Sequence, residues 1–408
     1  MLGGLRRLGA VLLSLVLPSL AACRTPTAPA ATRPAVASDR SPAGSPPPPP
    51  GSAALSPPAR PLSPPARPLR GPFDVEGQRA RIGVALPPPL APPPVAPVRD
   101  VLGVSFYVDE SKSIADPALK AQNVAALAPL RHFVAAVTQL SDGWMRSRPA
   151  DPRYARLAAQ RLAAWAAGGA LLGTVNQQGG YEREWTLGSL ALAYLKIREA
   201  PGLEPPARAT IEGWLCALAS AVRPPYERMD RRSSANNHAY WTGLAVAAAG
   251  TACQDRGLFD WGIARARIGV DQINADGLLP LELARQRLAL HYHLFALAPL
   301  VMLAELAAAN GIALYDEKDH ALRRLADRVI AGLAEPARFE SLTGFAQEQI
   351  TQPPRQTDLA WAEPYAARFP NATLGRWLAD ARPVVDVRLG GDLTAAFARP
   401  TADVQVVP

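Results

Sequence analysis

Apolar residues recur at three- and four-residue spacing through most of residues 99–408, and this spacing constrains the fold more than any other feature. It is the period of an α-helix with one buried face. We expect helices over residues 118–147, 153–172, 182–199, 206–222, 238–254, 258–273, 280–310 and 316–334. So many helices in one domain predict an all-α fold of stacked antiparallel helix pairs. An incomplete α/α toroid would bury them around one cleft, although periodicity alone leaves other all-α arrangements open.

Prolines mark where several of these helices begin or change course. Asp151-Pro152 and Pro205-Pro206 are typical helix starts, because proline is tolerated in the first turn. Pro299 lies inside an apolar helical pattern, where it should kink the helix or restart it. Strand-like alternation is confined to two short pieces, 101–108 and 384–389.

The first 22 residues have the features of an export signal. Arg6 and Arg7 precede an apolar stretch, 8–17, that is too short to span a bilayer. The run Leu20-Ala21-Ala22-Cys23 follows and resembles a bacterial lipobox, with Cys23 as the lipidated first residue of the mature chain. An ordinary signal peptide beside an incidental cysteine is the alternative. We therefore expect a lipoprotein on the periplasmic side of a bacterial membrane, or otherwise a soluble periplasmic protein.

Residues 23–98 are too rich in proline to form a packed domain. Residues 24–98 contain 23 of the chain's 43 prolines, and the heptapeptide Leu-Ser-Pro-Pro-Ala-Arg-Pro occurs at 55–61 and again at 62–68. Such a chain has few backbone donors and little apolar surface to bury. We interpret 23–98 as a disordered tether between the lipid and a folded domain, 99–408. A Pro-rich ligand for a partner domain is the alternative.

The net charge of +8 and the isoelectric point of about 9.7 favour a polyanionic partner. Nearly all of the positive charge is arginine, which binds carboxylates in a bidentate fork. Arginine-rich codon usage would explain the ratio of arginine to lysine but not the positive balance. We expect no nucleic acid partner, because the chain has no basic run and no recognisable nucleic-acid module.

Two cysteines remain after Cys23 is assigned to lipid. Cys216 and Cys253 fall near mirrored positions on two consecutive predicted helices, so they could form a disulfide in an oxidising compartment. Two buried thiols are the alternative. No Cys/His spacing suggests a zinc site, and we expect neither a metal nor another cofactor.

The run 234–241, Ser-Ala-Asn-Asn-His-Ala-Tyr-Trp, is followed about fifty residues later by Arg285 and Tyr292. An amide, an imidazole, a guanidinium and a phenol together suit β-elimination on a uronic-acid polymer. The enzyme must neutralise the substrate carboxylate, remove the acidic proton beside it and protonate the departing oxygen. The structural alternatives are a helix cap for Asn236 or Asn237 and core positions for the aromatic residues.

Arg285 and Tyr292 are seven residues apart in one predicted helix, 280–310. Residues seven apart lie on nearly the same helix face, so the two side chains should project together, about 10 Å apart along the axis. At that spacing arginine could hold the sugar carboxylate while the phenol reaches the bond that breaks. A surface arginine and a buried tyrosine are the alternative.

These segments resemble the alginate lyases of polysaccharide lyase family 5, the periplasmic mannuronate lyase type. The resemblance covers most of residues 100–397, and matching runs occur in the same order along the chain. They are 144–147, 163–166, 185–190, 236–241, 258–261, 282–293, 359–365 and 390–394. The resemblance implies an α/α toroid fold and β-elimination that leaves 4,5-unsaturated uronate ends.

The resemblance also implies a role for each catalytic residue. Asn237 and Arg285 share the charge of the substrate carboxylate, with His238 as a further neutraliser or alternate base. Tyr292 removes the C5 proton and returns it to O4, because the two groups leave from the same side in mannuronate. Arg285 must then help the phenol to ionise. Further candidates for substrate contacts are Asn236, Tyr240, Trp241, Lys112, Arg287 and His293.

The chain departs from the family pattern near residue 106. The family usually has Ser-Lys-Tyr there, and this chain has Ser105-Phe106-Tyr107; Lys112 is a possible substitute for the lysine. The exact polymer therefore stays open between mannuronate-rich alginate and another polyuronate such as polyglucuronate. A non-catalytic polysaccharide-binding lipoprotein is a further alternative. A hydrolase would need paired carboxylates, and none stands beside the Asn-Asn-His run, although Glu282 and Glu363 occur elsewhere. We expect a monomer.

Overall fold

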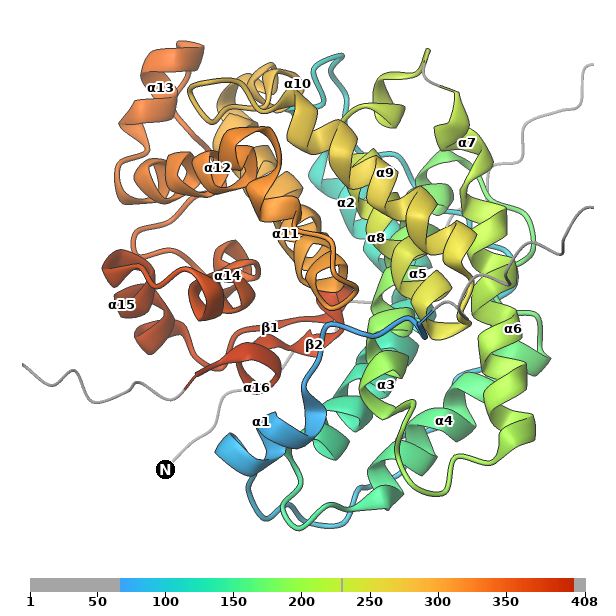
Figure 1. Cartoon of the computed structure of the whole chain (residues 1–408). Coiled ribbons are helices and arrows are strands. Elements are labelled where there is room, and N and C mark those ends of the chain that lie inside the picture. Colours follow the sequence, from blue (N-terminus) through green and yellow to red (C-terminus); the bar gives the residue numbers. More distant parts are fainter. Residues whose placement is uncertain (1–66, 229, 400–408) are drawn as a thin grey trace, which may run out of the picture. The chain divides into compact units, whose positions relative to one another are not determined.

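The computed structural model describes residues 67–228 and 230–399, and within them the regular secondary structure is almost entirely helical (Figure 1). The α-helices are α1 Val75–Ile82, α2 Pro117–Ala126, α3 Ala128–Arg146, α4 Pro152–Ala167, α5 Gln177–Ile197, α6 Pro205–Val222, α7 Pro224–Glu227, α8 Asn237–Ala252, α9 Arg256–Gln272, α10 Pro280–Leu283, α11 Ala289–Ala308, α12 Glu317–Ala334, α13 Ala337–Thr343, α14 Ala362–Arg368, α15 Ala372–Ala381 and α16 Leu393–Phe397. The 3-10 helices are η1 Arg232–Ser234, η2 Gln286–Leu288, η3 Leu314–Asp316, η4 Gln356–Leu359 and η5 Val387–Leu389. The strands β1 Val385–Asp386 and β2 Gly391–Asp392 form one short antiparallel pair.

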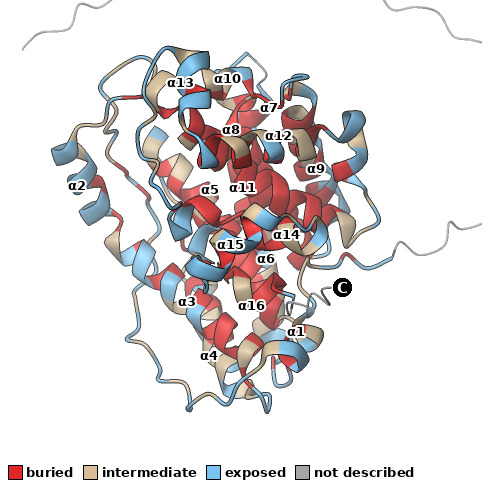
Figure 2. Cartoon of the chain, turned by 90° about the vertical axis from the view of Figure 1, so that its left-hand side faces the viewer, coloured by how far each residue is buried: buried red, intermediate tan, exposed pale blue. Residues whose placement is uncertain are grey.

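The long helices alternate between an inner and an outer layer. The inner helices α3, α5, α8 and α11 pack side by side in chain order, and the outer helices α4, α6, α9 and α12 cover them. Figure 2 shows the consequence, since α5, α8 and α11 are buried over nearly their whole length. The predicted all-α domain of stacked helix pairs is confirmed.

Close packing of α8 against α9 depends on glycine. A side chain at Gly262 would overlap the backbone carbonyl of Gly243, so the two helices can meet only where neither has a Cβ. Their contact brings α8 into the centre of the domain, with α5 and α11 on its other sides. The segment Gln286–Ala308 is long and apolar enough to cross a membrane, but 83% of its most apolar window is buried inside the domain. Its apolarity therefore suits its place in the core.

The predicted helix starts are confirmed. Asp151 caps α4 by accepting the backbone N–H of Arg153, and α6 begins at Pro205. Helix α11 continues through Pro299, so of the two predicted outcomes the restart does not occur and the kink stays a prediction. Proline lacks the N–H that would bind the carbonyl of Phe295, and the indole N–H of Trp241 on α8 donates to that carbonyl instead, at 3.0 Å. The packing against α8 thus satisfies the group that the proline leaves open.

Residues 67–98, here called the N-terminal strap, belong to the folded domain. Helix α1 packs on α3, and the backbone N–H and carbonyl of Leu69 bind the side chain of Gln254. Further along the strap, the carbonyl of Val95 accepts the indole N–H of Trp165 on α4. The predicted boundary at 98/99 is therefore wrong, because side chains of the helical domain satisfy the strap's backbone polar groups. The predicted signal peptide, Cys23 and the first part of the tether lie outside the described residues.

Cys216 on α6 and Cys253 at the end of α8 form a disulfide, as one of the two sequence interpretations expected. The short strand predicted at 384–389 is present as β1, whereas 101–108 contains only the isolated bridges of Val101 to Val175 and Tyr107 to Ala115. Residues 101–108 make too few backbone pairs to form a sheet.

A chain that begins at residue 99 should be less stable than one that begins at residue 67. Removing the strap exposes the surface under Leu69 and leaves the indole N–H of Trp165 without its acceptor. We expect a loss of roughly 3 kcal/mol or more in the free energy of unfolding. Urea denaturation of the two chains measures it, and equal midpoints would contradict the strap's structural role.

Loss of the disulfide should destabilise the domain without changing its chemistry. The two cysteines are 37 residues apart in sequence, and closing a loop of that length stabilises a fold by about 4 kcal/mol through the unfolded chain. The double variant Cys216→Ser/Cys253→Ser should therefore melt at a lower temperature than the unmodified protein. Calorimetry measures the shift, and unchanged melting in the variant would show that the bond contributes nothing.

Candidate active site

The four predicted catalytic residues come together at one end of the inner helices. Asn237 and His238 begin α8, Tyr292 lies in the first turn of α11, and Arg285 lies in the turn between α10 and η2. The guanidinium carbon of Arg285 is 4.4 Å from the centre of the Tyr292 ring. Both side chains are largely buried, with residue exposures of 5% and 7%.

The expected geometry of Arg285 and Tyr292 is wrong in detail. They do not share one helix, because the predicted helix 280–310 is divided into α10, η2 and α11. Pro280 begins the short α10, and Gln286 adopts a left-handed backbone conformation with φ 54°. This turn folds Arg285 back over the tyrosine ring, so the two groups are in contact and not two helical turns apart.

Two buried carboxylates lie beside the Asn-Asn-His run, so the expectation that none would do so is wrong. Glu282 accepts the backbone N–H of Asn237 at 2.8 Å and its side-chain Nδ2 at 3.0 Å from each carboxylate oxygen. Glu184 on α5 lies 3.6 Å from Nδ1 of His238 and accepts the hydroxyl of Thr242 at 2.7 Å. Sequence reasoning missed both carboxylates because they come from other helices. The available signal was the charged triplet Glu182-Arg183-Glu184 at the start of the predicted helix 182–199.

The phenol of Tyr292 is held in its neutral form. Burial raises its pKa, the neighbouring Tyr107 raises it further, and the positive charge of Arg285 only partly opposes them. The two phenol oxygens are hydrogen-bonded at 3.0 Å. The expectation that Arg285 lowers the pKa enough to ionise Tyr292 is therefore wrong for the free protein. Burial likewise raises the pKa of Glu282, against the hydrogen bonds from Asn237 and the charge of Arg285.

Aromatic rings that the sequence analysis did not single out surround His238. Tyr181 stacks on the imidazole at a centroid distance of 4.0 Å, and Trp185 lies 6.2 Å away. Phe295 meets Trp185 edge to face, and the exposed Arg388 from the C-terminal segment lies over both rings at 5.6 and 5.7 Å. A sugar ring could pack against such a surface while an arginine binds its carboxylate. Only the fold brings Arg388 here, from more than 100 positions after the Asn-Asn-His run.

Four of the predicted substrate-binding residues have structural positions instead. Asn236 caps α8 by accepting the backbone N–H of His238. Tyr240 is 1% exposed and its hydroxyl contacts Gln272, while the indole of Trp241 binds the Phe295 carbonyl. Both nitrogens of the fully buried His293 are engaged, because Nε2 accepts the N–H of Leu279 and Nδ1–H donates to the carbonyl of Ala289. These side chains face the core because they lie on the buried sides of α8 and α11.

Lys112 and Arg287 lie nearer the surface. Lys112 belongs to the exposed loop 108–114, whose Ser111 carbonyl accepts Nη1 of Arg285 at 3.0 Å. The lysine is therefore close in sequence to a residue that touches the site, and its contact with substrate stays a prediction. Arg287 instead pairs with Glu348 at 3.0 Å, so a bound carboxylate would have to compete with that partner.

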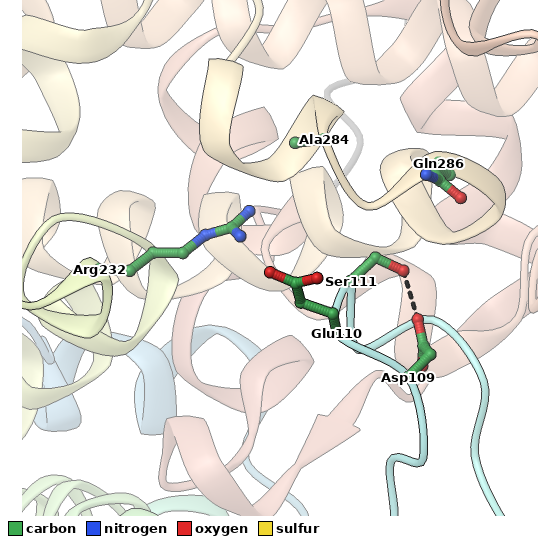
Figure 3. Close-up of a pocket in the computed structure, with 6 residues that line it drawn as sticks. All are labelled: Asp109, Glu110, Ser111, Arg232, Ala284 and Gln286. Atoms are coloured by element: carbon green, nitrogen blue, oxygen red, sulfur yellow. Dashed lines mark hydrogen bonds between the residues drawn. The ribbon is translucent and has the colours of Figure 1, made fainter.

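A hollow of about 390 Å³ lies beside Arg285. Figure 3 shows Arg232 and Glu110 projecting toward each other across it, with Ala284 and Gln286 from the turn around Arg285 on another side. Asp109 keeps the loop closed by accepting the backbone N–H groups of Ser113 and Ile114. In the part of the chain that the structure describes, no group of three His, Cys, Asp or Glu side chains is placed to hold a metal ion.

The alginate lyase family profile matches residues 105–339, which is more than half of the chain. The chain belongs to the alginate lyase family. It is 43% identical to a polysaccharide lyase of Stenotrophomonas maltophilia over 308 residues, covering 74% of this chain and 89% of that one. It is 35% identical to an alginate lyase of Pseudomonas fluorescens, covering 69% and 78%.

Solved structures give the same result for the fold. Alginate lyase A1-III complexed with a tetrasaccharide superposes with a TM-score of 0.73 at 25% identity, over 81% of this chain and 96% of that chain. A second crystal structure, of alginate lyase A1-III from Sphingomonas species A1, gives a TM-score of 0.71 at 26% identity over the same shares. These matches confirm the α/α toroid and the resemblance to alginate lyases of polysaccharide lyase family 5.

His293 should contribute to stability, and its contribution should depend on pH. Burial lowers its pKa to about 4, because protonation would set Nε2–H against the N–H of Leu279. The folded-state pKa lies below the unfolded value of about 6.5, so the contribution is complete above pH 6.5 and is lost as the pH falls toward 4.

The stability advantage of the unmodified protein over His293→Gln should shrink by roughly 3 kcal/mol across that pH window. Urea denaturation at pH 7 and at pH 4.5 measures the difference, and KM for the substrate should change little in the variant. A pH-independent difference between the two proteins would contradict the buried neutral imidazole.

Proposed function

We propose that this protein is a lyase that cleaves mannuronate-rich alginate by β-elimination and leaves 4,5-unsaturated uronate ends. The observation that carries the proposal is the guanidinium of Arg285 packed 4.4 Å from the ring of Tyr292. A cation that can bind a sugar carboxylate thus lies next to a phenol that can exchange a proton. Membership of the alginate lyase family and the tetrasaccharide bound by A1-III support the choice of substrate class.

Neutralising the carboxylate makes the adjacent C5–H acidic enough to remove. Arg285 and the Nδ2 group of Asn237 bind the carboxylate, with His238 nearby. They stabilise the enolate-like anion that forms when the C5 proton leaves. The electron pair of the C5–H bond becomes the C4–C5 double bond, and the C4–O4 bond breaks. A proton must then reach O4 of the departing sugar.

Tyr292 is placed both to remove the C5 proton and to deliver a proton to O4. In mannuronate the C5 hydrogen and O4 lie on the same face, so one group can take the proton and return it. Because the free protein raises the pKa of this phenol, it carries its proton at rest and suits the role of acid. To act as base it must first release that proton to water or to another base, and in the free protein its O–H donates to the hydroxyl of Tyr107. His238 is the alternative base, with Tyr292 then acting only as acid.

The alternatives draw on different features. Phe106 in place of the usual lysine leaves room for another polyuronate, such as polyglucuronate, or for a protein that only binds the polymer. A hydrolase would need two available carboxylates, and the two beside the Asn-Asn-His run, Glu184 and Glu282, are already engaged. Glu282 is engaged by the backbone and side-chain N–H groups of Asn237. Glu184 accepts the hydroxyl of Thr242 beside His238, so neither carboxylate is left free to act as the acid or base of a hydrolase.

We also propose that the protein is a monomeric lipoprotein on the periplasmic side of a bacterial membrane, anchored through Cys23. The support is the lipobox-like run that ends at this cysteine. The disulfide between Cys216 and Cys253 agrees with an oxidising compartment. Metabolic labelling with a radioactive fatty acid tests the anchor, and label that survives Cys23→Ser would contradict it.

Tyr292→Phe should abolish most of the activity while the fold remains. Near-ultraviolet absorbance during incubation with polymannuronate, polyguluronate and polyglucuronate detects unsaturated ends and identifies the polymer. We expect the mature chain to act best on polymannuronate and Tyr292→Phe to lower kcat by roughly 10²–10⁴-fold.

Tyr315→Phe is the matched control, because Tyr315 is a buried tyrosine whose hydroxyl binds Glu305 away from the site. It should retain nearly full kcat. A flat absorbance trace for the folded mature chain on all three polymers would favour a binding protein. Full activity in Tyr292→Phe would remove the phenol from the mechanism.

A further inference from the structure

Glu282 joins two groups of the candidate site that come from different parts of the chain. It lies in α10, three residues before Arg285, and is fully buried. Its carboxylate accepts the backbone and side-chain N–H groups of Asn237, 45 positions earlier in the sequence. One of its oxygens is also 3.8 Å from Nε of Arg285.

We propose that Glu282 is a positioning residue of the elimination, which fixes the amide of Asn237 and the guanidinium of Arg285 toward the substrate carboxylate. The inference rests on the proposed lyase function, and it adds a residue that acts through two others without touching the substrate. Three contacts carry it: two N–H groups of Asn237 and the guanidinium of Arg285.

The carboxylate of Glu282 decides which end of the Asn237 amide faces the substrate. Burial raises the pKa of Glu282, but the N–H donors of Asn237 and the charge of Arg285 oppose that shift by favouring the ionised form, which can only accept hydrogen bonds and so binds Nδ2 and repels Oδ1. A single N–H of Nδ2 can lie between the two carboxylate oxygens, which leaves its second N–H for a ligand. Oδ1 is buried and has no hydrogen-bond partner among the described residues. Without Glu282 the amide could rotate and present this oxygen to the negatively charged substrate.

Other buried glutamates pair with arginine differently. Glu305 binds Nε and Nη2 of Arg368 at 2.9 and 2.8 Å, and Glu363 binds the same two nitrogens of Arg382 at 2.7 and 2.9 Å. In each pair the carboxylate occupies one edge of the guanidinium. Glu282 instead directs its hydrogen bonds to Asn237 and stays 3.8 Å from Arg285, whose Nε has no hydrogen-bond partner among the described residues.

This arrangement keeps the guanidinium available. The negative charge of Glu282 and the carbonyl of Ser111 hold Arg285 in place, while Nη2, which makes no hydrogen bond among the described residues, can still donate to a uronate carboxylate. Removing the charge of Glu282 should leave Arg285 able to attract the substrate but less well aligned with the anion that forms in the transition state. The loss should therefore fall on kcat more than on KM.

The test compares Glu282→Gln with Glu363→Gln in the mature chain, with polymannuronate as substrate. Glutamine keeps the size of the side chain and removes the charge. We expect Glu282→Gln to lower kcat on the order of tenfold to hundredfold, which is a smaller loss than deleting a donor that contacts the transition state directly. KM should change by less than about threefold. Glu363→Gln should lose stability and keep kcat within about twofold. Glu282→Asp, which restores the charge, should recover part of the rate.

A kcat within twofold of the unmodified protein for Glu282→Gln would overturn the proposal, as would equal losses in the two glutamine variants. If Glu282→Gln does not fold, the side-chain amide of Asn237 in the unmodified protein provides the test by nuclear magnetic resonance with asparagine labelling. Hydrogen exchange at that amide should be at least tenfold slower than at the exposed amides, and equal rates would overturn the proposal. If no polymer yields unsaturated ends, the lyase function is rejected. The exchange measurement does not depend on catalysis, so it would still show whether Glu282 holds the side-chain amide of Asn237.

Discussion

The contact between the inner helices α8 and α11 sets the position of almost everything else in the site. Pro299 leaves the carbonyl of Phe295 without an N–H in its own helix, and the indole of Trp241 supplies one from α8. This bond fixes how far one helix is shifted along the other. His238 lies three positions before Trp241 and Tyr292 three positions before Phe295, so each lies about one turn from the bond.

Burial then determines what these groups can do. Tyr292, Glu282 and His293 are all removed from water, and burial shifts the pKa of each toward the neutral form, although the N–H groups of Asn237 and the charge of Arg285 oppose that shift at Glu282. Their roles differ because their partners differ. His293 has both nitrogens engaged by backbone and serves the fold, and Glu282 holds Asn237. Among the described residues, the hydroxyl of Tyr292 binds only another phenol, and its ring lies under the guanidinium of Arg285. A group with unfilled hydrogen-bonding capacity near an arginine is the one that can act on a substrate.

The sequence predicted the helices better than their interruptions. Amphipathic periodicity reports a buried face, and it located α4, α5, α6, α8, α9 and α12 within about five residues, although it merged α2 and α3 into one helix, 118–147. It did not locate the break between α10 and α11, because the apolar residues continue through the turn at Gln286. It also assigned the N-terminal strap to a tether, since proline-rich chain carries little apolar surface of its own. The strap is ordered by groups elsewhere in the chain, such as Gln254 and Trp165.

By itself, the sequence determined the all-α class, the Asn-Asn-His run, Arg285 and Tyr292, because periodicity and residue type are local properties that a single chain displays; the toroid followed from the resemblance to the alginate lyases. Only the tertiary structure decided which side chains meet. Glu184, Glu282, Tyr107 and Arg388 reach the site from segments distant in sequence, whereas Tyr240, Trp241 and His293 turn into the core. A hydrogen bond or a stacked ring between distant segments depends on how helices pack, and that packing is settled by the whole domain at once.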